Sequence, residues 1–212
     1  SLSNPQVSNQ EKSNILEKKL TTLGWYDQLH FADPEGKIIA STFKQAIYQD
    51  ISKEIWYPQI KQNFIHVTDV MVSRFLGKEV LIFSNTVQDE QNNVLGYVIA
   101  EFSLDVLTDL LKSTPQNFEA YLISKKGKII AQKGPPLQEN PSISSKGFYQ
   151  SKDTFLQQQV FSQGYFSFTG NEWQVVVQIL KETAYEPIRN FTFLLFVFAL
   201  LIGLLVVILG HF

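Results

Sequence analysis

The sequence predicts an α+β protein in which two tandem antiparallel-sheet modules lie alongside a long N-terminal helix and precede a C-terminal transmembrane helix. Three observations support this fold class. The phrase GKIIA occurs twice, beginning at Gly36 and again at Gly127, and a strand-like segment and a turn precede each copy. A helical pattern with a capping signal opens the chain, and residues 191–212 contain no Asp, Glu, Lys or Arg.

The N-terminal helix is predicted from its cap and its spacing. Ser8 and Glu11 have the separation of a capping box, leucines such as Leu16 and Leu20 recur at helical intervals, and Gly24 ends the run. We expect a helix of about fifteen residues that starts at Ser8 and runs alongside both modules.

The first module begins with a hairpin and is rich in strand patterns. Asp33-Pro34-Glu35-Gly36 has proline and glycine where a turn needs them, directly before a β-branched run. A helical stretch bent by Pro58 is expected over 51–64. Further strands and an exit helix are then predicted at 67–75, 78–88, 94–104 and 104–112.

The second module repeats the hairpin and leads into the membrane. Residues 118–133, FEAYLISKKGKIIAQK, contain the second GKIIA, and a final strand ends at about Leu180. A helix is expected to follow at once and to pass through Pro187. These boundaries give a helical segment, a membrane-distal module, a membrane-proximal module and a transmembrane helix at 1–24, 25–113, 114–188 and 189–212.

The C-terminal apolar stretch has the length of a membrane span. At 1.5 Å per residue, a helix over 191–212 covers about 33 Å, which matches the hydrocarbon thickness of a bilayer. The alternative is a buried core helix, for which a domain of this size has little room. Because the sequence starts without methionine and stops at the end of this stretch, we expect it to be part of a longer protein.

Composition excludes several classes of function. The 212 residues carry a net charge of −2 and no cysteine, and no basic patch with interleaved aromatics occurs, so we expect neither nucleic-acid binding nor thiolate chemistry. The histidines lie far apart, which argues against a metal site. Without a phosphate-binding loop or nucleophile elbow, we expect no cofactor and no catalysis within this chain, although an enzymatic output domain could follow it.

The order of these segments resembles the double Cache family of PAS-like extracytoplasmic sensors, found in bacterial chemoreceptors, histidine kinases and cyclic-nucleotide enzymes. The resemblance rests on FADPEGKIIAST, LISKKGKIIAQ, IWYPQI, VLGYVIAEFSLDVLTDLL and NEWQVVVQILKETAYEPI, in that order. It implies two PAS-like modules, a position outside the cytoplasm on the cell membrane, a small-molecule ligand and a homodimer. It also implies that ligand binding is passed to the cytoplasm through the C-terminal helix.

The resemblance points to a binding site around IWYPQI. In amino-acid-sensing relatives, a tyrosine, an arginine and a Trp-Tyr pair lie on this helix, and an aspartate lies on the module's last strand. Trp56 and Tyr57 match the aromatic pair, and Glu101 takes the aspartate's position. Glu54 stands in place of the arginine and Gln49 in place of the first tyrosine. Without that arginine, a ligand carboxylate loses its main partner.

We therefore expect the site between the IWYPQI helix and the strands bearing Phe83 and Glu101, with a preference for a cationic or neutral compound such as an amine over an amino acid. Glu101 would supply charge, because a carboxylate within an apolar strand is costly to bury without a partner. The alternative for Glu101 is that strand alternation turns it toward water.

The other candidates have equally plain alternatives. Trp56 and Tyr57 could simply pack against the sheet. Asp69 and Arg74 flank a predicted strand and could reach the same concavity, or could be surface charges that pair with each other. Three functional classes compete: a sensor module, a membrane-anchored structural or protein-interaction domain without a ligand, and an anchored enzyme.

Overall fold

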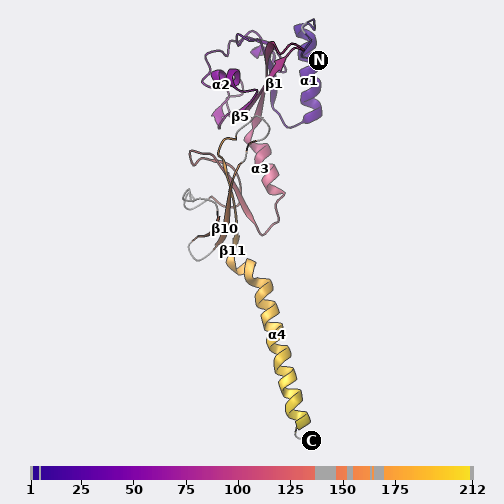
Figure 1. The fold of residues 1–212 in the computed structure, drawn as a ribbon, viewed down its shortest axis with the longest axis vertical. Helices are drawn as coiled ribbons and strands as arrows, with labels where there is room; N and C mark the ends of the chain where they lie inside the picture. Colours follow the sequence, from indigo (N-terminus) through magenta and orange to yellow (C-terminus); the bar gives the residue numbers. More distant parts are fainter. Residues whose placement is uncertain are drawn as a thin grey trace.

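The computed structural model describes residues 2–4, 6–136, 147–151, 155–162, 164 and 170–210. Within them the chain forms two antiparallel sheets, one after the other, and a helix that projects away from the second sheet (Figure 1). The α+β class with antiparallel sheets is therefore confirmed. The helices are α1 (Asn9–Leu23), the 3-10 turn η1 (Lys44–Ala46), α2 (Tyr57–Gln62), α3 (Leu104–Lys112) and α4 (Lys181–Gly210).

The two sheets have the same strand order. The N-terminal sheet runs β2-β1-β6-β5-β3, with β4 pairing to β5, and the C-terminal sheet runs β8-β7-β11-β10-β9. Both GKIIA strands, β2 and β8, therefore lie at the equivalent edge of separate sheets. The strands are β1 (Gln28–Ala32), β2 (Ile38–Ser41), β3 (Ile65–Val67), β4 (Met71–Val72), β5 (Glu79–Gln88), β6 (Val94–Ser103), β7 (Glu119–Ile123), β8 (Ile129–Lys133), β9 (Gly147–Ser151), β10 (Phe155–Phe161) and β11 (Gln174–Leu180).

The repeated phrase follows two turns of the same design. Gly36 and Gly127 have φ angles of 98° and 81°, in the left-handed region that favours glycine. Their N–H groups donate to the carbonyls of Asp33 and Ser124 at 3.0 and 2.9 Å. The same two residues accept, through their side chains, the N–H of the lysine that follows each glycine, at 2.8 and 3.0 Å. The phrase thus starts the second strand of each hairpin.

Helix α1 has the predicted caps but not the predicted reach. Ser8 and Glu11 form the capping box, and Gly24 in the left-handed conformation donates to Leu20. With 15 residues the helix is about 22 Å long. It packs on β1 and β2, with Leu16 in the core, beside the N-terminal sheet only (Figure 1). The expectation that it runs alongside both modules is wrong, because the helix is too short.

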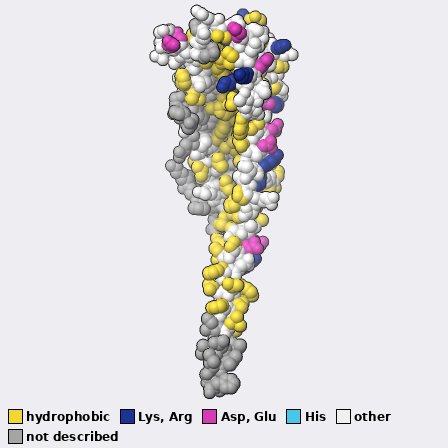
Figure 2. All heavy atoms as spheres, turned by 90° about the vertical axis from the view of Figure 1, so that its right-hand side faces the viewer, with side chains coloured by type: hydrophobic (Ala, Val, Ile, Leu, Met, Phe, Trp, Pro, Cys, Tyr) yellow, Lys and Arg dark blue, Asp and Glu magenta, His cyan; other side chains and the backbone are white. Residues whose placement is uncertain are grey.

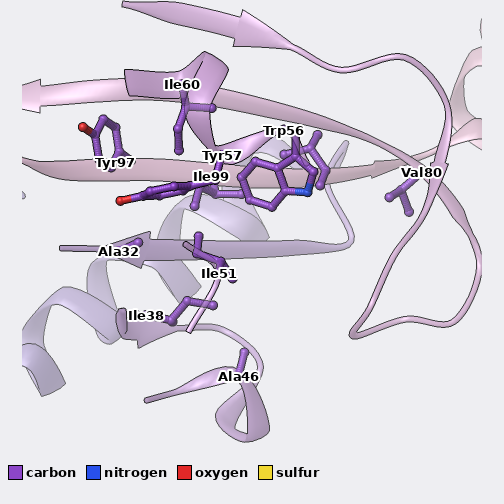
Figure 3. Packing of buried hydrophobic residues seen from close by; sticks show 11 residues of the cluster. Ala32, Ile38, Ala46, Ile51, Trp56, Tyr57, Ile60, Val80, Tyr97 and Ile99 are labelled. Atoms are coloured by element: carbon purple, nitrogen blue, oxygen red, sulfur yellow. The ribbon is translucent and has the colours of Figure 1, made fainter. Parts of the chain in front are cut away.

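The N-terminal sheet has an apolar core on each face. On one face, Leu29, Phe31 and Ala100 pack under α1 with Leu16. On the other, eleven buried residues form a cluster that includes Trp56, Tyr57 and Tyr97 and reaches the segment between β2 and α2 (Figure 3). Burial of this apolar area on both faces is the main force that stabilises the sheet.

Two elements beside this second face are shorter than predicted. Helix α2 occupies only Tyr57–Gln62, so Trp56 is its N-cap, and Pro58 lies in its first turn. The predicted strand at 67–75 is divided between β3 and β4. Ser73 then makes a turn, in which its hydroxyl oxygen accepts the N–H groups of Phe75 and Leu76 at 3.0 and 2.9 Å.

The C-terminal part continues without a loop into the projecting helix. Strand β11 ends at Leu180 and α4 begins at Lys181, as predicted, and the helix passes through Pro187. Over Lys181–Leu201 it is long and apolar enough to cross a membrane, and none of it is buried. Hydrophobic side chains dominate its described part on the face seen in Figure 2. The last two residues of the predicted span lie outside the described part.

Candidate functional site

Strand alternation turns one set of side chains of the N-terminal sheet toward α2. In β6 these are Tyr97, Ile99 and Glu101, and in β1 they include His30 and Gln28. Gln28 lies directly opposite Glu101 in the β1–β6 pairing. This face therefore carries aromatic and aliphatic groups at one end and polar groups at the other.

Glu101 is the charged group at the polar end. It is 2% exposed, so the alternative that it faces water is excluded. The Ser73 hydroxyl donates to its Oε2 at 2.6 Å, and His30 Nε2 lies 3.7 Å from its Oε1. A buried carboxylate with one short hydrogen bond has capacity for further donors.

His30 connects this carboxylate to the edge of the sheet. Its Nδ1 lies 2.8 Å from Ser41 Oγ, and that oxygen accepts the Phe43 N–H at 2.8 Å. Ser41 Oγ and His30 Nδ1 are hydrogen-bonded, and the tautomer of the imidazole decides which of them donates. His30 Nε2 and Gln28 Oε1 are both buried and without a hydrogen-bond partner. Polar capacity is therefore unused on both sides of Glu101.

The aromatic end consists of Trp56, Tyr57 and Tyr97, all buried (Figure 3). The Tyr57 and Tyr97 rings meet edge to face at 6.0 Å, and the Tyr57 hydroxyl donates to the Pro34 carbonyl at 2.9 Å. Burial raises the pKa of both phenols, so they remain neutral. Lys61 Nζ lies 5.2 Å from the centre of the Tyr57 ring, which shows that this ring already attracts a cation.

Arg74 is exposed and its guanidinium already has acceptors. Its Nη1 donates to the Asp50 carbonyl at 3.0 Å and lies 3.5 Å from Glu54 Oε1, and its Nη2 donates to Gln49 Oε1 at 3.1 Å. A hydrogen bond from Ser52 lowers the pKa of the Asp50 carboxyl in the same loop. Arg74, which the sequence offered as a partner of Asp69, is thus hydrogen-bonded instead to the loop that precedes α2.

Besides Arg74, two more of the predicted site residues do not join this group. Phe83 lies opposite Ala100, whereas Glu101 lies opposite Ile82. Alternation therefore points Phe83 to the α1 face, where its ring packs against Phe102 at 5.7 Å. The expectation that Phe83 lines the same site as Glu101 is therefore wrong, because the two side chains lie on opposite faces of the sheet.

Asp69 is partly buried in the turn after β3. Its Oδ1 accepts the N–H of the next residue, Val70, at 3.0 Å. This contact caps the turn, and none of the hydrogen bonds among the described residues joins Asp69 to Glu101.

Sequence reasoning missed His30, Gln28, Ser73 and Tyr97. A signal was available for the first two, because alternation in QLHFA places Gln28 and His30 on one face of the same strand. Ser73 comes from a turn that the sequence pattern assigned to a strand. Among the described residues, no group of three or more His, Cys, Asp or Glu side chains could hold a metal ion.

The arrangement is suited to binding rather than to bond breaking. An acid at the end of an aromatic-lined face provides a counter-charge for a cation and apolar walls for its carbon atoms. A family model described as the Cache domain matches residues 1–188. The chain belongs to the Cache domain family. Cache sensor domains are non-catalytic ligand-binding domains.

Solved structures of similar fold are sensor domains. An extracellular ligand-binding receptor from Desulfohalobium retbaense has a TM-score of 0.67 at 14% identity, over 84% of this chain and 34% of its own length. This Cache chain thus spans about a third of that receptor. The extracellular domain of rpHK1S-Z16, described as a histidine kinase, has a TM-score of 0.65 at 15% identity, covering 85% and 81% of the two chains.

A third similar structure contains a ligand. It is the ligand-binding domain of the Campylobacter jejuni chemoreceptor Tlp3 with 4-methylisoleucine, and it has a TM-score of 0.63 at 17% identity, covering 86% of this chain and 75% of its own. At such identities the likeness concerns the fold. A search of curated proteins found no match to this sequence.

Proposed function

We propose that this Cache chain is the extracytoplasmic sensing part of a transmembrane signalling receptor and that it binds a small amine at the α2 face of the N-terminal sheet. The observation that carries the proposal is Glu101, an acid that is 2% exposed, accepts one side-chain hydrogen bond, from Ser73, and lies opposite Gln28, whose Oε1 is buried without a hydrogen-bond partner. Burying an acid in this way is costly, and a ligand ammonium would offset that cost.

The preference for an amine over an amino acid follows from Arg74. The Tlp3 domain of similar fold holds an amino acid, and a ligand carboxylate needs a cationic partner. Arg74 is the cation next to the position where relatives are expected to have arginine. Its N–H groups already donate hydrogen bonds to Asp50, Gln49 and Glu54. Glu54 also adds a negative charge there, which further disfavours a carboxylate.

The same proposal includes the module boundaries and the route of the signal. We assign 25–113 and 114–188 to two PAS-like modules and 189–212 to the membrane. The direct passage from β11 to α4 supports the idea that movement of the C-terminal sheet displaces the helix. A flexible Gly-Ser insertion after Lys181 should then uncouple binding from output without abolishing binding. The homodimer stays a prediction.

The binding proposal is tested by thermal unfolding of the full 212-residue chain in lipid nanodiscs. The probes are putrescine and ethanolamine as amines, isoleucine and serine as amino acids, and lactate and malate as organic acids. A ligand at a hundred times its dissociation constant stabilises the folded state by about 2.7 kcal/mol, which raises the melting temperature by several degrees.

Three variants locate the effect. Glu101→Gln should abolish stabilisation by the amine, because it removes the counter-charge and keeps the shape. Trp56→Phe should weaken it by shrinking the aromatic wall. Glu90→Gln makes the same chemical change at an exposed acid in the β5–β6 turn and should leave the shift intact. Amino-acid binding that survives Glu101→Gln, or no stabilisation by any probe, would overturn the proposal.

A further inference from the structure

One face of the C-terminal sheet is lined by glutamines. The pairing of β10 with β11 and of β11 with β7 turns Gln157, Gln159, Gln174 and Gln178 to one side, together with Glu119 and Tyr121. All four glutamines are buried, with exposures of 5 to 8%, and Tyr121 is 0% exposed. Glutamines are mostly exposed in folded proteins, so four that are buried on one face are unusual.

Part of this polar face is satisfied internally. Gln178 Nε2 donates to Glu119 Oε2 at 2.6 Å, and the Tyr121 hydroxyl lies 3.1 Å from the same oxygen and 2.8 Å from the Pro135 carbonyl. Burial raises the pKa of Tyr121, so the phenol remains a neutral donor. Glu119 Oε2 is therefore held by Gln178, and the one hydroxyl proton of Tyr121 is shared between this oxygen and the nearer Pro135 carbonyl.

The remaining part is not satisfied. Gln174 Nε2 donates to Gln159 Oε1, but Gln159 Nε2 is buried and without a hydrogen-bond partner. The bond that Gln159 Oε1 accepts from Gln174 fixes the orientation of the Gln159 amide, and so fixes the direction of its unpaired Nε2. A buried amide of this kind is costly unless another molecule supplies an acceptor.

Among the described residues, the apolar cluster on this face is smaller than the one on the α2 side of the N-terminal sheet. The described buried cluster here consists of Tyr121, Ile123 and Val176, compared with eleven residues in the α2-side cluster of the N-terminal sheet. Along β7, β10 and β11, every described side chain on the face other than Glu119 is uncharged. The face therefore combines uncharged amides, which both donate and accept hydrogen bonds, with apolar side chains such as Ile123 and Val176.

We propose that this face is a second binding site, separate from the amine site, for a small neutral compound rich in hydroxyl groups, such as a monosaccharide or polyol. Hydroxyl groups donate and accept, as amides do, so they match a row of glutamines. Gln159 Nε2 donates to a ligand oxygen. Anionic compounds are excluded by Glu119, whose charge has no described Lys or Arg beside it on these strands.

The test is isothermal titration of the full chain in nanodiscs with glucose, galactose, ribose and inositol. Glucuronate and glucosamine serve as charged comparison compounds. At least one neutral compound should bind, and Gln159→Leu should raise its dissociation constant tenfold or more. The matched control is Gln158→Leu, since Gln158 is the exposed neighbour on the opposite face and should change the constant less than twofold.

Two further variants make the outcome decisive. Gln159→Glu removes the free donor with little change in shape and should also abolish binding, and circular dichroism establishes that each variant is folded. Glu101→Gln should leave binding of the neutral compound unchanged, so this site and the amine site succeed or fail independently. The proposal is overturned if no neutral compound binds, if binding survives both Gln159 variants, or if Glu101→Gln abolishes it.

Discussion

The two sheets share a strand order but differ in which strand carries the acid and which carries the amide of one cross-strand pair. In the N-terminal sheet the first and last strands place Gln28 opposite Glu101. In the C-terminal sheet the same two strands place Glu119 opposite Gln178. The acid and the amide have thus exchanged strands at a corresponding position.

The exchange goes with a different hydrogen-bond pattern. Glu119 Oε2 accepts a hydrogen bond at 2.6 Å from Nε2 of Gln178, the residue that lies opposite it. Glu101 Oε2 accepts a hydrogen bond from the hydroxyl of Ser73, in the turn after β4. Gln28 Oε1, which lies opposite, is buried without a hydrogen-bond partner. In the C-terminal sheet the acid is hydrogen-bonded by a residue of a neighbouring strand. In the N-terminal sheet the acid is hydrogen-bonded by a residue of a turn. The same backbone therefore presents two different chemistries, decided by a few inward-facing residues.

The largest expected effect concerns the other face of each sheet. Phe31 and Leu122 each lie opposite the alanine of a GKIIA phrase. Phe31 is 0% exposed under α1, so Phe31→Ala should destabilise the N-terminal sheet by about 3–5 kcal/mol. Leu122 is only partly buried, and Leu122→Ala should cost about 1–2 kcal/mol. Native-state hydrogen exchange measures each sheet separately, and equal losses would contradict the comparison.

The next effect isolates the exchanged pair. A double-mutant cycle of Glu119→Ala and Gln178→Ala should give a coupling of about 1.5–3 kcal/mol, as for a hydrogen bond to a charged group. The corresponding cycle of Glu101→Ala and Gln28→Ala should give less than about 0.5 kcal/mol, because none of the hydrogen bonds of the described residues joins that pair. Thermal unfolding of the wild type and the six variants supplies both values. Equal couplings would mean that the two pairs are equivalent after all.

Much of the fold could be predicted because its signals are local. The cap at Ser8, the glycine turns and the apolar run before Phe212 each depend on a few adjacent residues. Helix α3 was predicted with the bounds that the structure has. The reach of α1 was not, because it depends on helix length and on which sheet covers Leu16.

The candidate site was predicted less completely because it is assembled from distant strands. Trp56, Tyr57 and Glu101 came from the family resemblance, through two separate stretches of sequence, and the structure places all three toward the same face. His30 meets Glu101 only through the β1–β6 register, which no local pattern reveals. Phe83 was misplaced for the same reason, since a shift of one residue along β5 reverses the face.

A smaller effect tests whether the sheets are coupled directly. Asn171 Nδ2, before β11, donates to the carbonyl of Thr68, which follows β3, at 3.0 Å. Asn171→Ala should cost about 0.5–1.5 kcal/mol and lower the melting temperature of the full chain by a few degrees. Asn85→Ala, at an exposed position in β5, is the matched control and should change it little. A larger loss in the control would show that this bond does not join the two sheets effectively.

The smallest effect is a pH dependence confined to the N-terminal sheet. Burial lowers the pKa of His66 in β3 below its ordinary value. Above about pH 6.5 the folded and unfolded chains both hold this imidazole neutral. As the pH falls below that value, the unfolded chain takes up the proton first, so stability decreases until the pH passes the lowered pKa of the folded state. Melting temperatures between pH 7.5 and 5 should therefore fall more steeply for the wild type than for His66→Gln. Hydrogen exchange in β11 should lack this His66-dependent component, because none of the strands of the C-terminal sheet contains a histidine. Parallel profiles for the two proteins would show that His66 contributes nothing, and a His66-dependent change in β11 would show that the sheets unfold as one unit.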